Sequence, residues 1–219
     1  LIILLTEQQY LSILKNTEQE NFWIGAFGDQ YIKRNEGKAS SEGRDYKYIN
    51  QFSKIFLNNR ITINSAIEIG ANIGINLDSL KILFPKCKTF GIEINKKAHS
   101  ILKNKHSSFL GSIYEFNEDL EYELSFSRTV LIHQNEKYLE NFYEKLFNLS
   151  SKYILIDEYF SPNPVMVKYR EHDNKLFKRD FAKEFWNKFP ELELVDYGFF
   201  WSQDSFTKSD DTNWFLFKK

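Results

Sequence analysis

Glu68-Ile69-Gly70-Ala71-Asn72-Ile73-Gly74 is the stretch that decides the fold. It follows the apolar, β-branched run 61–69, which predicts a buried parallel strand, and it precedes leucines at 77, 80 and 83, whose spacing predicts a helix. Glycines at a strand-to-helix junction permit a tight turn and close approach of the backbone to a ligand, and the helix N-terminus offers free N–H groups. The stretch therefore predicts a ligand-binding turn in an α/β protein.

An acid stands at the end of the next predicted strand, Thr89–Ile94. Glu93 is placed to accept hydrogen bonds from both ribose hydroxyls of an adenosine ligand. A nicotinamide dinucleotide fingerprint would require glycines at 70, 72 and 75, whereas the chain has Asn72 and Ile75. Glu68 would also repel a pyrophosphate but would suit the positively charged amino and sulfonium groups of S-adenosylmethionine. S-adenosylmethionine is therefore the predicted ligand, and a dinucleotide-dependent oxidoreductase is the disfavoured alternative.

The rest of the chain continues the alternation of strands and helices that a parallel sheet requires. The periodicity predicts helices over 6–16, 45–58, 96–103, 138–149 and 181–189, and strands near Phe109 and over 123–132, 153–158, 192–201 and 213–217. The last two strands follow one another without a helix. The predicted fold is a Rossmann-like α/β domain with a mostly parallel sheet and a C-terminal antiparallel hairpin.

The 219 residues suit one domain with additions. We expect an N-terminal helix and a cofactor-covering segment over 1–44, with an irregular flap of aromatic residues and glycines at 21–35. The domain proper is expected over 45–219. A polar, proline-containing insertion at about 160–180 is expected to lie above the strand ends, where long loops usually carry function.

Composition excludes several other classes of protein. With 29 basic and 30 acidic residues the formal net charge is −1, which is unlike a general nucleic-acid binder. A single cysteine excludes a disulfide framework, and the four histidines have no metal-ligand spacing, so we expect no metal. The apolar opening, Leu1–Leu5, is far shorter than the roughly 20 residues that cross a bilayer. We expect a cytoplasmic protein that binds neither membrane nor nucleic acid.

The glycine turn and the following acid resemble the first two motifs of the class I methyltransferase superfamily. Asn72 replaces the middle glycine of that superfamily's pattern. The resemblance implies a fold and a set of residues that bind S-adenosylmethionine: Glu68, Gly70, Ala71, Asn72, Gly74, Glu93, Ile94, Gly111, Ser112 and Ile113. Trp23 and Phe27 are expected to cover the cofactor from the N-terminal segment.

Several other stretches resemble a smaller methyltransferase family that is associated with pseudaminic acid biosynthesis. They are 22–31, 130–133, 158–162, 169–184, 196–199 and 210–215. Glu171 stands where that family's Tyr-Arg-Gly-His pattern has glycine, and Arg128-Thr129 replaces a more usual Lys-Gly. The resemblance implies O-methylation of a hydroxyl on a nonulosonic acid or a related sugar.

Candidate catalytic residues lie at predicted strand ends, where doubly wound folds keep their sites. His133 is a candidate base or hydroxyl-orienting group, with a helix cap as its structural alternative, and Glu158 and Tyr159 follow one strand later. The insertion gathers Tyr169, Arg170, His172, Lys178 and Arg179, which could bind the carboxylate or phosphate of an acidic sugar or could form a solvated surface. A catalytically silent adenosyl-binding scaffold is a further alternative. The sequence does not specify an oligomeric state.

Overall fold

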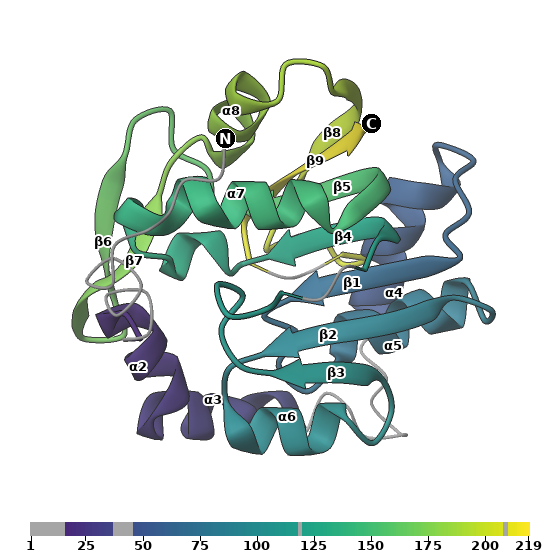
Figure 1. Ribbon diagram of the computed structural model, residues 1–219. Coiled ribbons are helices and arrows are strands. Elements are labelled where there is room, and N and C mark those ends of the chain that lie inside the picture. The colour runs from purple at the N-terminus through teal and green to yellow at the C-terminus, as the bar shows by residue number, and fades with distance from the viewer. Residues whose placement is uncertain (1–15, 37–45, 118–119, 208–209) are drawn as a thin grey trace.

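A seven-stranded sheet in the order β3-β2-β1-β4-β5-β9-β8 forms the centre of the computed structural model, which describes residues 16–36, 46–117, 120–207 and 210–219 (Figure 1). Five strands are parallel: β3 (Ser107–Leu110), β2 (Lys88–Glu93), β1 (Ser65–Ile69), β4 (Tyr122–Arg128) and β5 (Ser150–Glu158). β9 (Thr212–Lys218) and β8 (Glu193–Phe200) add an antiparallel hairpin at one edge. The predicted fold class and the predicted C-terminal hairpin are confirmed.

Helices cover both faces of the sheet, because the buried strands are apolar on both faces. α7 (Leu139–Asn148) and α8 (Phe181–Lys188) pack with Ile67 on one face (Figure 1). α4 (Tyr46–Phe52), its π-helical continuation Ser53–Leu57, α5 (Ile75–Leu83) and α6 (Lys96–Leu102) contribute to the other face, which contains Ala66. Neighbouring residues of β1 therefore serve two separate cores. Within the part of the chain that the structure describes, no helix has the length and apolar character required to cross a bilayer.

Two strands are shorter than the sequence predicts. Ile61 and Ile63 are buried, which explains the apolar run, but pairing of β1 begins only at Ser65. β4 ends at Arg128 instead of residue 132, because Thr129 adopts a positive φ of 53° and the chain then turns into a 3-10 helix, Leu131–His133. His133 therefore lies in a helical turn beyond the strand and not directly at its end.

The N-terminal segment is helical where the sequence predicts an irregular flap. A capping box between Thr17 and Glu20 starts α2 (Glu18–Ile24), and α3 (Ala26–Glu36) follows after Gly25. Gly28 permits the tight packing of the two helices, since an added Cβ would lie 1.8 Å from the carbonyl oxygen of Trp23. The helix predicted over 6–16 falls on residues that, except for the last, lie outside the described part of the chain.

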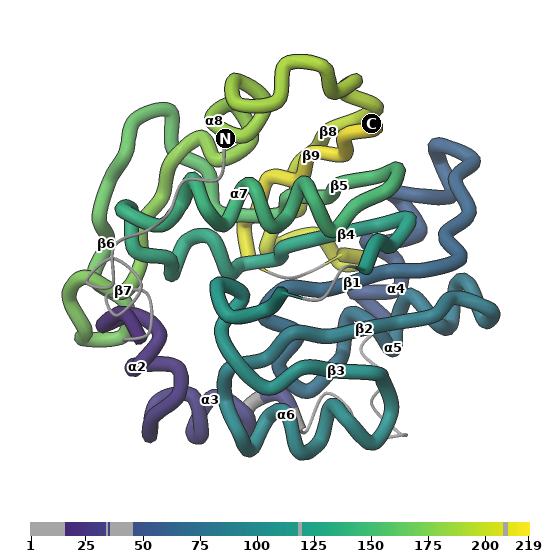
Figure 2. The backbone as a smooth tube through the Cα atoms, viewed as in Figure 1, coloured from purple at the N-terminus to yellow at the C-terminus, as the bar shows by residue number. Residues whose placement is uncertain are grey.

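The predicted insertion is a β-hairpin, which the sequence did not indicate. β6 (Val165–Tyr169) and β7 (His172–Lys178) form a separate two-stranded sheet. Arg170 and Glu171 make the turn with φ of 48° and 68°, the left-handed region that two-residue hairpin turns require and that glycine favours. The backbone trace shows this hairpin beside α2 at the same end of the molecule (Figure 2). Gln19 of α2 donates to the carbonyl oxygen of Asn174, which ties the two together.

Candidate functional site

A cavity of about 1100 Å³ opens at the carboxyl ends of the parallel strands. Its lining includes residues 68–73 after β1, 92–95 after β2, 111–113 after β3 and most of 128–134 after β4. The other walls come from α2, α3, the start of α4, Tyr159, Tyr169 and parts of 205–212. This is the edge of the sheet at which doubly wound folds bind ligands.

The predicted glycine turn forms one wall of the cavity. Gly70 and Gly74 adopt φ of 75° and 86°, and a Cβ on Gly70 would lie 2.6 Å from Val130. Asn72, in place of a glycine, also takes a positive φ, of 49°, which asparagine tolerates better than most residues. Its side-chain oxygen accepts a hydrogen bond from Asn35 at 3.1 Å, so α3 closes against the turn. Gly74 is the N-cap residue of α5 and does not itself line the cavity.

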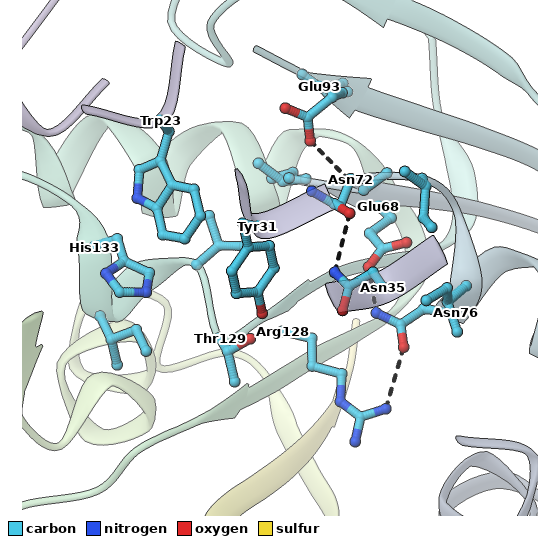
Figure 3. Close-up of a pocket in the computed structure, with 18 of the residues that line it drawn as sticks. Trp23, Tyr31, Asn35, Glu68, Asn72, Asn76, Glu93, Arg128, Thr129 and His133 are labelled. Atoms are coloured by element: carbon cyan, nitrogen blue, oxygen red, sulfur yellow. Dashed lines mark hydrogen bonds between the residues drawn. The ribbon is translucent and has the colours of Figure 1, made fainter. Parts of the chain in front are cut away.

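Glu93 is held at the same turn by backbone groups. Its carboxylate accepts a hydrogen bond from the N–H of Asn72 at 2.7 Å (Figure 3). It accepts another from the N–H of Asn95 at 2.6 Å. Burial raises the pKa of Glu93 to about 6, and the backbone hydrogen bonds oppose that rise. The two backbone N–H groups fix the carboxylate in position at the cavity wall.

Glu68 is more deeply buried, with 1% of its surface exposed. Asn76 donates to its Oε1 at 2.6 Å, whereas its Oε2 has no hydrogen-bond partner among the described residues (Figure 3). Burial raises the pKa of Glu68 to about 8, although Asn76 and Arg128 lower it. A buried carboxylate oxygen without a partner costs free energy, so this wall of the cavity suits a ligand that donates or carries positive charge.

Arg128 lines the cavity and was not among the predicted site residues. Its Nε lies 2.8 Å from Oδ2 of Asp157 in a buried ion pair, and its guanidinium also donates to Gln51 and Asn76 (Figure 3). The ring of Tyr48 lies 5.0 Å from the guanidinium carbon. In the sequence Arg128 was an arginine within the apolar strand predicted over 123–132, and it stood where the resembled family has lysine.

His133 lines the cavity beside Trp23, with ring centroids 4.8 Å apart (Figure 3). Its Nδ1 lies 2.5 Å from the carbonyl oxygen of Lys175 on β7. A carbonyl only accepts, so Nδ1 carries the proton and Nε2 is left as an acceptor. Burial lowers the pKa of His133 to about 4, which keeps the ring neutral at physiological pH.

Glu158 does not line the cavity, contrary to its expected catalytic position. Its carboxylate accepts hydrogen bonds from the hydroxyl of Ser127 and from the N–H groups of Val130 and Leu131, at 2.9 to 3.0 Å. Burial raises its pKa to about 7. These hydrogen bonds fix the backbone at residues 130 and 131, just after β4, so Glu158 holds the loop that leads to His133. Sequence position alone could not distinguish this task from contact with a substrate.

Tyr159 does line the cavity, and its hydroxyl lies near the carboxylate of Asp210. Burial and this carboxylate raise the pKa of Tyr159, so the phenol stays protonated. Tyr31 of α3 lies near Tyr159 and Tyr169, and burial raises its pKa to about 12. Tyrosine hydroxyls from two distant parts of the chain thus gather at this end of the cavity, and only Tyr159 and Tyr169 were predicted.

The structure does not bring the cationic residues of the hairpin into the cavity lining. Arg170 is exposed at the turn, and Arg179 forms ion pairs with Glu136 at 3.0 Å and with Glu184 at 2.9 Å. Side chains alternate in direction along a strand, and Tyr169 is the one member of the predicted set that lines the cavity.

The other two members of that set pack on aromatic rings. The His172 ring lies 4.9 Å from that of Phe22, and Lys178 Nζ lies 5.1 Å from the ring centroid of Tyr159. Phe27 also lies behind the lining, stacked on Phe22 at 4.1 Å. These residues support the walls and do not contact the space inside.

Ile94, Gly111, Ser112 and Ile113, which were predicted to bind the cofactor, line the cavity together with residues of α2. Glu20 accepts a hydrogen bond from the hydroxyl of Ser112 and was missed, although the spacing of Thr17 and Glu20 is that of a capping box. Among the described residues, no group of three or more histidine, cysteine, aspartate and glutamate side chains could hold a metal ion.

Comparison with known proteins identifies the fold. No family model matches the chain, and no curated protein matches its sequence. One similar solved structure is magnesium protoporphyrin IX methyltransferase from Synechocystis PCC 6803 with bound S-adenosylmethionine, with a TM-score of 0.65 and 10% identity over 93% of this chain and 98% of that one. A second, an S-adenosylmethionine-dependent methyltransferase from Leishmania major, has a TM-score of 0.63 and 17% identity over 96% of this chain and 90% of that one. A third, from Clostridium acetobutylicum, has a TM-score of 0.61 and 13% identity over 88% of this chain and 99% of that one. The chain has the fold of S-adenosylmethionine-dependent methyltransferases.

Proposed function

We propose that the chain binds S-adenosylmethionine in the cavity and transfers its methyl group to a small molecule. The observation that carries the proposal is Glu93, a carboxylate fixed by two backbone N–H groups beside the Gly70–Gly74 turn. Ribose hydroxyls are matched donors for such a carboxylate. The similar solved structures, all methyltransferases, support the same ligand.

The residues around Glu93 fit the rest of this cofactor. Ile94 and residues 111–113 offer a wall for adenine beyond the ribose. Gly70 leaves no Cβ at the turn, and the unpartnered Oε2 of Glu68 suits the ammonium group of the methionine end. When bound, the cofactor supplies a methyl group on a positively charged sulfur. A dinucleotide fits less well, because the chain has Asn72 and Ile75 where a dinucleotide-binding turn has glycines.

His133 acts in this proposal as the group that orients an acceptor hydroxyl. Its Nε2 is an acceptor in a neutral ring, and the carbonyl of Lys175 holds the ring in that tautomer. With a pKa of about 4 it is a weak base, so its contribution is alignment of the nucleophile more than removal of the proton. Tyr159 and Tyr31 offer hydroxyls to the same acceptor.

The N-terminal segment is proposed to cover the cofactor. Trp23 and Tyr31 line the cavity from α2 and α3, and Asn95 at the end of β2 donates to the carbonyl oxygen of Trp23 at 3.0 Å. These contacts support the proposal that residues 16–36 cover the cofactor. Such a cover excludes water from the methyl group.

An acidic sugar acceptor is the finer form of the proposal, and its support is the resemblance to the pseudaminic acid-associated family. The acceptor end of the cavity offers tyrosine hydroxyls, and Arg128 lies beside it, although Asp157 balances its charge. Once an acceptor is found that the enzyme methylates and that carries a carboxylate, Arg170→Ala and Arg179→Ala test whether these arginines bind that carboxylate. Each should raise the acceptor KM about tenfold if it does. An uncharged analogue that reacts equally well excludes the acidic acceptor.

Titration calorimetry with S-adenosylmethionine and S-adenosylhomocysteine tests the cofactor, with NAD as the comparison ligand. We expect both sulfur ligands to bind and NAD not to compete. Mass spectrometry of sugars and other small hydroxylated molecules incubated with methyl-labelled cofactor then tests transfer. Binding without transfer to any acceptor would favour the adenosyl-binding scaffold, and binding of NAD alone would overturn the proposal.

A further inference from the structure

α2 places a further carboxylate, that of Glu20, in the cavity wall, and the proposed function gives it no role. Glu20 is 9% exposed and lines the cavity together with Trp23, three residues later on the same helix face. We infer that Glu20 recognises the exocyclic amino group of the adenine ring and so selects adenosine over other nucleosides. This inference rests on the proposed function, because it concerns the same cofactor.

The position of Glu20 follows from its contact with Ser112. The Ser112 hydroxyl donates to Oε1 of Glu20, and the N–H of the preceding Gly111 donates to the carbonyl oxygen of Glu93 at 3.0 Å. Ser112 thus belongs to the segment that continues the wall from the ribose-binding carboxylate toward the base. The Glu20 carboxylate therefore lies beyond the expected ribose position, where the edge of the adenine ring of the bound cofactor would reach it.

The carboxylate of Glu20 retains capacity to accept hydrogen bonds. Each carboxylate oxygen has two acceptor sites. One on Oε1 is used by Ser112 and one on Oε2 by the N–H of Thr17 at 2.7 Å. An amino group offers two N–H donors to the sites that remain. Hypoxanthine and guanine have a carbonyl at the same ring position. Its oxygen would face the Glu20 carboxylate with no hydrogen between the two acceptors, which is unfavourable.

Helix capping accounts for only one of the contacts of Glu20. The capping box uses Oε2 and the backbone of Thr17, and the same box forms in helices with no ligand nearby. It requires neither burial in a cavity wall nor the hydrogen bond from Ser112, which lies 92 residues away in sequence. The two roles of Glu20 can therefore be separated by variants.

The test compares two ligands by titration calorimetry on the full chain. One is S-adenosylhomocysteine, and the other is the analogue in which hydrogen replaces the exocyclic amine of the base. Wild type is expected to prefer the amine about tenfold or more, as for a hydrogen bond to a charged group. Glu20→Ala should reduce the preference to within about twofold, and Glu20→Gln should leave an intermediate value because its amide oxygen still accepts.

Thr17→Ala is the matched control, because it breaks the capping box and keeps the carboxylate. It should lower the melting temperature as Glu20→Ala does, yet keep the wild-type preference. Equal binding of both ligands by wild type, or a preference that survives Glu20→Ala, overturns the inference and leaves the proposed function intact. Failure of wild type to bind S-adenosylhomocysteine overturns both. Should Glu20→Ala not fold, the wild-type ratio and Glu20→Gln decide.

Discussion

Two walls of the cavity obtain their geometry in different ways. The turn wall, residues 68–74 with Glu93, is set by short-range backbone conformation, since glycines and asparagine in the left-handed region place backbone N–H groups against a carboxylate. The hairpin wall, β6 and β7, reaches the cavity through Tyr169 and depends on contacts between distant segments, such as Gln19 with Asn174 and His133 with Lys175. The first wall is built mainly by the main chain, and the second by the packing of separate elements.

Glu93→Ala should have the largest effect on binding, because it removes two charge-assisted hydrogen bonds from the turn wall. We expect the affinity for S-adenosylmethionine to fall by about 2 to 4 kcal/mol in calorimetry. Glu123→Ala is a suitable control, because Glu123 pairs with Asn64 at the opposite end of the sheet. Unchanged affinity in Glu93→Ala would mean that the turn wall does not hold the ribose.

His133→Ala tests the point where the hairpin wall meets the reacting groups. Turnover is expected to fall about 10²-fold while cofactor affinity stays within about twofold, since orientation of the acceptor is lost and the turn wall is untouched. Because its pKa is lowered to about 4, His133 stays neutral and should add no inflection to the rate between pH 6 and 8. Near-normal turnover would reduce His133 to a structural contact with Lys175.

The contrast between the walls explains what the sequence could predict. The order of strands and helices, the C-terminal hairpin and the position of Glu93 follow from local periodicity and from the rule that parallel strands end at one edge. Local periodicity also placed Gly70 and Gly74 in a tight turn, and their φ values of 75° and 86° are those of such a turn. The roles assigned to these residues in binding stay predictions.

Long-range contacts account for what the sequence did not predict. Glu158 was predicted as a candidate catalytic residue because it ends a strand, but its direction depends on the N–H groups of Val130 and Leu131, which turn toward it only in the folded chain. Arg170 and Arg179 were read as one cluster, yet the hairpin places one at an exposed turn and pairs the other with Glu136. Side-chain direction at such positions is a property of tertiary packing.

Glu68→Gln should separate stability from binding at the turn wall. Glu68 has a folded pKa of about 8 against an ordinary value of 4.5, so the unfolded chain loses its proton first and stability falls as pH rises between these values. Because glutamine does not titrate, Glu68→Gln should remove this decrease in stability with pH. The free energy of unfolding, measured by denaturant titration at several pH values between 5 and 8, tests the expectation. The same variant should bind S-adenosylmethionine about tenfold more weakly, since a neutral amide attracts the ammonium group less. A variant that binds as tightly as wild type would remove Glu68 from the proposed site.

Glu171→Gly should give the smallest effect and a gain in stability. Glu171 adopts a φ of 68° in the two-residue turn of the hairpin, where a side chain with a Cβ costs about 1 kcal/mol or more. Glycine removes this cost but loses more entropy on folding, so we expect a net stabilisation of about 0.5 kcal/mol in denaturant titrations. Glu171→Ala is the control, because it deletes the exposed ion pair with Lys168 and retains the Cβ. If strain in the turn is the cause, only glycine stabilises. Equal stability of the two variants would mean that the hairpin wall carries no backbone strain at this turn, and that the departure from the Tyr-Arg-Gly-His pattern is neutral for folding.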